Sequence, residues 1–100
     1  MIKRELRIGK LKEECVEEYL KAHDNIWPEL VREYKQNGMY EISCFLNKTD
    51  LYIYFKYEQE IWEKVDKSQL VWDRKWQEHM KTLSCKVPEE VQPVEVFFMA

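Results

Sequence analysis

Alternating apolar and polar residues at the start of the chain predict a β-strand. Over residues 2–10 the two sides of this strand carry different residues, with Ile2, Leu6 and Ile8 on one and Lys3, Glu5 and Arg7 on the other. A period of two is typical of a strand that buries one side.

From Glu13 the period becomes helical. Apolar and aromatic positions recur at steps of three and four residues: Val16, Leu20, His23, Trp27, Leu30 and Tyr34. Pro28 interrupts this stripe because it lacks the N–H that would bond the carbonyl of Asp24. We therefore expect a break near Asp24–Asn25, with Asn25 capping the second piece and Pro28 in its first turn. Gly38 is suited to the left-handed position after the helix.

The second half of the chain predicts a hairpin, two helices and a last strand. Residues 39–46 and 51–57 are rich in β-branched and aromatic residues, and the polar residues between them predict a short turn. Helical patterns follow over residues 58–68 and 68–83, and residues 93–100 have the pattern of a strand.

This order of elements indicates one α+β domain over residues 1–100. One antiparallel sheet with helices packed on one face would cover each apolar helix face. The other sheet face is expected to carry Phe45, Phe97 and Met99 among polar residues, with no further helix to cover it. A second copy of the chain could cover it, so the sequence predicts a homodimer packed sheet to sheet.

Composition and charge exclude several classes of partner. Hydrophobic residues are 45% and charged residues 35% of the 100 residues, which is typical of a globular protein. The net charge is −3 and the basic residues are scattered among acids, so we expect no nucleic-acid partner. No apolar run approaches the roughly 20 residues of a membrane helix, and residues 1–10 lack the apolar centre of a signal peptide.

The cysteines and histidines give no pattern of a metal site. Cys15, Cys44 and Cys85 are odd in number and far apart, which favours reduced thiols in the cytoplasm. His23 and His79 have no closely spaced ligand partner, so we expect no metal.

The pair Tyr19 and His23 is the main candidate for chemistry. Four residues apart on a helix, the two side chains can converge on one pocket. Histidine donates or accepts a proton near neutral pH, and a His–Tyr pair suits proton transfer between two oxygens. The alternative is a histidine with a structural role.

The chain resembles the L-rhamnose mutarotase family from end to end. The resemblance rests on "MIKRELRI", "EEYLKAHDNIWPEL", the "NG" before the second strand, "W…KW…HM" in the last helix and the ending "EVFF". The segment H-x-x-I-W-P-E-L is its specific part. The resemblance implies a ferredoxin-like fold that pairs into a dimeric α+β barrel.

The resemblance also implies an isomerase that interconverts the α and β anomers of a 6-deoxyhexose, without cofactor or metal. The family's proton-donating histidine falls on His23, its substrate-binding tyrosine on Tyr19, and a tryptophan of the last helix on Trp76. The family's strand tyrosine falls on Ile42, with Tyr40 two residues earlier on the same face, and a second tryptophan falls on Gln77.

These two departures leave the sugar open. L-Rhamnose is the leading substrate, and L-fucose and L-lyxose are alternatives. A non-catalytic sugar-binding module and a monooxygenase-type enzyme of the same dimeric fold are the competing functions.

Overall fold

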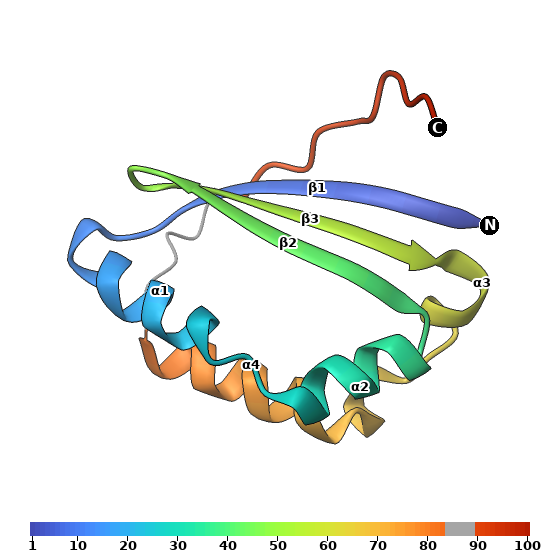
Figure 1. Cartoon of the computed structure of the whole chain (residues 1–100), viewed down its shortest axis with the longest axis horizontal. Helices are drawn as coiled ribbons and strands as arrows, with labels where there is room; N and C mark the ends of the chain where they lie inside the picture. The colour runs from blue at the N-terminus through green and yellow to red at the C-terminus, as the bar shows by residue number, and fades with distance from the viewer. Residues whose placement is uncertain (84–89) are drawn as a thin grey trace.

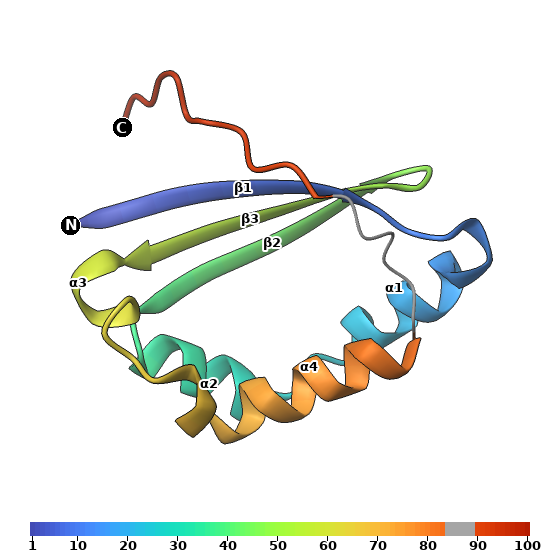
Figure 2. The same ribbon diagram turned by 180° about the vertical axis from the view of Figure 1, so that it is seen from behind.

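The computed structural model describes residues 1–83 and 90–100, and their strands form one three-stranded antiparallel sheet. The strand order is β1-β3-β2, with bounds as follows: β1 (Ile2–Lys10), β2 (Met39–Asn47) and β3 (Asp50–Glu58). The longer helices lie on one side of this sheet (Figures 1 and 2), namely α1 (Val16–Asp24), α2 (Pro28–Gln36) and α4 (Val71–Leu83). The α+β sheet with helices on one face is therefore confirmed. Of the described helices, none is long and apolar enough to span a membrane.

The core joins the start of the first helical region to the central strand. A short 3-10 turn, η1 (Glu13–Cys15), leads into α1. Leu11, Tyr19 and Leu51 are almost fully buried against one another. Since side chains alternate across a strand, Leu51, Ile53 and Phe55 of β3 all point to this inner face.

The helix break at Pro28 is confirmed, but its cap differs from the prediction. Helix α1 ends at Asp24, and Pro28 is the first residue of α2. Trp27, with an extended backbone, is the N-cap residue, whereas Asn25 is the C-cap residue of α1. Three residues therefore separate the helices, because the chain must become extended before a proline can start a new turn.

The expected hairpin is also present. Gly38 precedes β2 with a φ of +91°, the left-handed conformation that glycine adopts readily. Strands β2 and β3 pair from Asn47 and Asp50 outward across a two-residue turn. Phe45 pairs with Tyr52 on the outer face of the sheet and is 60% exposed, as the sequence predicted.

The helix expected over residues 58–68 is much shorter than predicted. Only one α-helical turn forms, α3 (Gln59–Trp62), followed by the 3-10 turn η2 (Lys67–Gln69). The side chain of Glu58 accepts from the N–H of Glu60, and that of Asp66 accepts from the N–H of Ser68. Glu58 therefore caps the start of the predicted helix, and Asp66 starts a new turn inside it and divides that segment.

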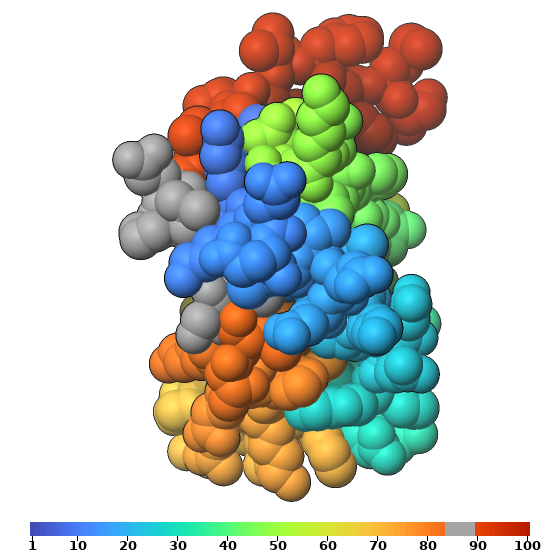
Figure 3. Space-filling view, turned by 90° about the vertical axis from the view of Figure 1, so that its left-hand side faces the viewer, coloured from blue at the N-terminus to red at the C-terminus, as the bar shows by residue number. Residues whose placement is uncertain are grey.

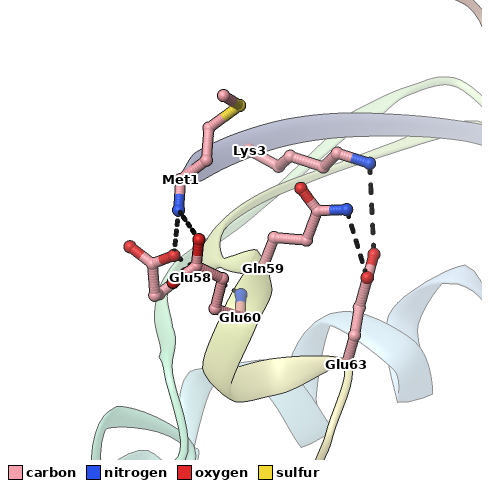
Figure 4. Close-up of polar contacts among 6 residues, drawn as sticks. All are labelled: Met1, Lys3, Glu58, Gln59, Glu60 and Glu63. Atoms are coloured by element: carbon pink, nitrogen blue, oxygen red, sulfur yellow. Dashed lines mark hydrogen bonds and ion pairs between the residues drawn. The ribbon is translucent and has the colours of Figure 1, made fainter.

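The N-terminus is held against α3 by charged groups (Figure 4). The amino group of Met1 bonds the carboxylate of Glu58, and Lys3 Nζ lies 4.0 Å from a Glu63 oxygen. Gln59 Nε2 donates to Glu63 at 3.1 Å. These contacts join the first residues of β1 to the turn that follows β3.

The last strand expected over residues 93–100 does not form in this chain alone. One bridge pairs Val91 with Ile8, and beyond it the backbone leaves the edge of β1. Pro93 has no N–H to continue a strand ladder, which accounts for the interruption. The C-terminal residues stand above the sheet, on the side away from the helices (Figure 3). Cys85, predicted to be a reduced thiol, lies outside the described residues.

One side chain of β1 holds this C-terminal segment. The guanidinium of Arg4 donates from Nε and Nη2 to the two carboxylate oxygens of Glu95, at 3.1 and 3.0 Å. It also lies 3.3 Å from the centre of the Phe98 ring. Val94, Val96, Phe97 and Met99 nevertheless remain exposed.

A carboxylate of α2 anchors the start of α4. Glu33 accepts hydrogen bonds from the N–H groups of Trp72, at 3.2 Å, and Asp73, at 2.8 Å. First-turn N–H groups have no partner within their own helix, and a negative charge there is favoured by the helix dipole. Glu33 therefore sets the position of α4 relative to α2.

We expect Glu33→Ala to lower the free energy of unfolding by about 1 kcal/mol, with a range of about 0.5–2 for lost helix caps. For a domain of this size about 1 kcal/mol corresponds to a fall in Tm of roughly 4–8 °C. Thermal unfolding followed by circular dichroism would measure it. Arg32→Ala, at an exposed position of the same helix, is the control. Equal Tm values for the two variants would contradict the anchoring role.

Candidate active site

A cavity of about 800 Å³ lies between the inner face of the sheet and the helices. Its volume falls within the usual range of about 300–1,000 Å³ for small-molecule sites. All five residues that the sequence singled out line it: Tyr19, His23, Ile42, Trp76 and Gln77. They come from α1, β2 and α4, so the fold brings together residues that are far apart in the chain.

His23 lies in the last turn of α1 and is held by a backbone hydrogen bond. Its Nδ1 is 2.8 Å from the carbonyl oxygen of Tyr19. A carbonyl oxygen only accepts, so Nδ1 carries the hydrogen and donates it. The neutral imidazole therefore keeps its lone pair on Nε2, and the protonated ring has a second N–H there. Nε2 is the atom available for proton transfer.

Aromatic rings fix the imidazole from two sides. The ring of Tyr19 stacks on that of His23 with centroids 4.2 Å apart, and Trp76 meets it edge to face at 5.3 Å. Trp27 packs against Trp76 at 5.3 Å and stacks with His79 at 6.0 Å. Tyr19 and Trp76 are almost fully buried, so these rings leave the imidazole little freedom to turn.

The strand wall of the cavity differs from the sequence interpretation at Tyr40. Ile42 pairs with Phe55 and points inward. A bulge between Met39 and Glu41 interrupts the alternation, so that Met39 takes the buried inner position. Tyr40 still lines the cavity, but at its rim, where it is 41% exposed.

Gln77 belongs to a polar group on the helix side of the cavity. The hydroxyl of Tyr34 donates to Asp73 Oδ1, and Gln77 Nε2 donates to the same oxygen at 3.4 Å. Burial, and secondly the bond to Asp73, raise the pKa of Tyr34 well above its usual range. Its phenol is therefore a hydrogen-bond donor at all physiological pH values.

The sequence interpretation missed a second polar group, on β1 and β3. Arg7 Nε donates to Glu5 Oε2 at 2.9 Å, and the hydroxyl of Tyr57 donates to Glu5 Oε1 at 3.3 Å. Burial, and secondly the nearby Glu5, raise the pKa of Tyr57. Arg7 pairs with Ile53 and lines the cavity, so the charged side of β1 faces the helices. A charged strand side is normally solvated, and no signal in the sequence marked this one as internal.

No metal centre is apparent in the described part of the chain. Residues 1–83 and 90–100 contain no group of three or more His, Cys, Asp or Glu side chains that could hold an ion. The lining of the cavity includes groups that can take part in proton transfer or hydrogen bonding, among them the imidazole of His23, the tyrosine hydroxyls and the amide of Gln77.

Comparison with known proteins finds similarity to one enzyme family. A family model described as L-rhamnose mutarotase matches residues 5–99. The L-rhamnose mutarotase of Oceanobacillus iheyensis is 37% identical over 83% of this chain and 85% of its own length. That of Bacillus subtilis is 31% identical over 98% of this chain and 99% of its own.

Two solved structures share the fold. A crystal structure of L-rhamnose mutarotase from Formosa agariphila superposes with a TM-score of 0.74 at 25% identity, covering 98% of this chain and 99% of that one. A protein described as dimeric and ferredoxin-like, from an uncultured marine organism, superposes with a TM-score of 0.61 at 20% identity. This match covers 100% of this chain and 99% of that one. The second likeness is one of fold alone.

The raised pKa of Tyr34 predicts a pH-dependent contribution to stability. The folded protein holds the phenolic proton more tightly than the unfolded chain, whose tyrosines titrate near pH 10. The stabilisation is therefore complete below about pH 10 and is lost as the pH rises above it. We expect Tyr34→Phe to lower the free energy of unfolding by about 1–2 kcal/mol at pH 8. Urea titrations from pH 8 to 11 should show this gap shrinking, and a constant gap would contradict the assignment.

Proposed function

The chain belongs to the L-rhamnose mutarotase family, and on that premise we propose that it interconverts the α and β anomers of L-rhamnose. The observation that carries the proposal is the shared cavity of Tyr19, His23 and Trp76. We propose His23 as proton donor and the other two as substrate-binding residues, together with Ile42 and Gln77. We propose that residues 1–100 act as a single domain in the cytoplasm, where reduced thiols are expected.

The proposed reaction needs only protons. A proton from His23 Nε2 goes to the ring oxygen, the anomeric hydroxyl loses its proton to water, and the bond between ring oxygen and anomeric carbon breaks to give the aldehyde. Rotation about the bond between the first two carbons exposes the other face of the carbonyl. On reclosure the ring hydroxyl attacks the carbonyl carbon and returns its proton to His23, while the carbonyl oxygen takes a proton back from water to form the other anomer. The Nδ1 bond to the carbonyl of Tyr19 supports this role because it leaves Nε2 facing other partners.

We expect His23→Ala to slow anomeric exchange by about 10²–10⁴-fold, which is the usual contribution of a positioned acid. Saturation-transfer NMR of the anomeric protons of L-rhamnose measures this rate at equilibrium. Tyr19→Phe keeps the ring that stacks on His23, so its effect should be smaller. His79→Ala, outside the cavity but in the same aromatic group, is the control. If His23→Ala exchanges anomers near the wild-type rate, His23 has a structural role. If the wild-type protein binds the sugar saturably without speeding exchange, it is a sugar-binding module.

We also propose that the protein is a homodimer packed through the outer sheet face. Phe45 on that face is 60% exposed, and Val96 and Phe97 of the C-terminal segment are 96% and 78% exposed. The C-terminal segment lies on the side of the sheet that the longer helices leave open (Figure 1). A second copy would bury them and remove apolar surface from water.

Light scattering at micromolar concentration should give about twice the mass of the chain. Phe45→Asp should shift this mass toward that of the monomer, because dimerisation would bury a charge without a partner. Glu41→Asp, on the same strand, is the control for a surface change. A wild-type protein that remains monomeric would overturn this assembly.

A further inference from the structure

A second, more polar chamber adjoins the main cavity. This chamber has a volume of about 460 Å³ and lies between β1, β3 and the start of α4. It lies next to the main cavity, and both are lined by Arg7, Tyr34, Met39, Ile42, Phe55 and Gln77. The two chambers meet where Ile42 and Gln77 stand.

The helix wall of this chamber presents hydrogen-bond acceptors. Both side-chain donors that reach Asp73, Tyr34 and Gln77, bond its Oδ1. Among the described residues Asp73 Oδ2 therefore keeps its lone pairs for another donor. Gln77 uses its amide nitrogen in this bond and retains its carbonyl oxygen as a second acceptor.

The sheet wall presents charges that already offset one another. Arg7 contacts Glu5 at 2.9 Å and Glu90 at 3.9 Å. An anionic ligand would have to compete with these carboxylates for the guanidinium. A neutral hydroxyl group need not displace these carboxylates, because it can donate its hydrogen to an acceptor and accept a hydrogen bond from a donor at the same time.

Trp76 links the proposed proton donor with the helix wall of the chamber. Its ring lies 5.3 Å from the imidazole of His23, centre to centre, and Asp73 lies three residues earlier on α4, about 4.5 Å along the helix axis. A pyranose ring that lies against Trp76 would have one end toward His23 and the other toward Asp73. A sugar with its anomeric carbon at His23 would therefore extend its far side toward Asp73 and Gln77.

We propose that Asp73 and Gln77, held by Tyr34, form a subsite that binds the sugar hydroxyls farthest from the anomeric carbon and thereby selects the sugar. This inference rests on the proposed function for the placement of the anomeric carbon. Asp73 and Gln77 are specificity-determining residues in this assignment, and the proton transfer remains with His23.

Binding of an inert sugar tests the subsite separately from catalysis. The probe is 1,5-anhydro-L-rhamnitol, which lacks the anomeric hydroxyl and cannot open its ring, together with its 3-deoxy and 4-deoxy forms. NMR titration gives Kd for each. The wild type should bind at least one deoxy form about tenfold more weakly than the parent, as expected for one lost hydrogen bond to a charged acceptor.

The variants Asp73→Asn and Gln77→Met should weaken binding of the parent by a similar factor and leave Kd of that deoxy form unchanged. In L-rhamnose exchange they should raise KM with little change in kcat, a split that a fold defect would not produce. Glu78→Gln, an exposed position on the same helix, is the matched control.

The outcomes separate the two proposals. Selective loss of parent binding without any catalysed exchange would support the subsite and overturn the mutarotase activity. Normal exchange with Kd and KM unchanged in both variants, or equal wild-type affinity for the parent and both deoxy forms, would overturn the subsite.

Discussion

The absent N–H of Pro28 is the constraint on which the candidate site depends. Since Pro28 cannot bond the carbonyl of Asp24, α1 ends there and α2 begins at Pro28 itself. The break leaves His23 in a final turn, where its ring lies beside the cavity and not within a continuous helix. It also frees Trp27 to turn its ring onto Trp76, which in turn touches the imidazole. One missing hydrogen bond thus aligns the proposed donor and its aromatic support.

The second half of the site depends on the contact between α2 and α4. The carboxylate of Glu33 holds two N–H groups at the start of α4, and the next residue, Tyr34, bonds the side chain of Asp73. Trp76 and Gln77 follow within one turn, so their positions are set by α2. The two helices that flank the break therefore determine both ends of the cavity.

Much of this architecture could be predicted from periodicity and from a few special residues. Three features are local effects that depend only on neighbouring residues in the sequence: the alternation in β1, the break at Pro28 and the left-handed conformation of Gly38. The grouping of Tyr19, His23 and Trp76 followed from the family resemblance. Longer-range effects were missed: the cap by Asp66 that divides a helical pattern, and the bulge at Tyr40 that changes which residue faces inward.

The orientation of β1 was the least predictable feature, and it connects the site with the proposed assembly. A strand with one apolar and one charged side would ordinarily turn its apolar side to the helices. Here Arg7 and Glu5 face the helices, and Leu6 and Ile8 lie on the outer face. This arrangement is favourable if a sugar with many hydroxyls occupies the inside and a second copy of the chain covers the outside. The same strand then supplies polar groups to the cavity and apolar surface to the dimer. In that arrangement, sugar binding and dimer formation both restrict which residues β1 can carry.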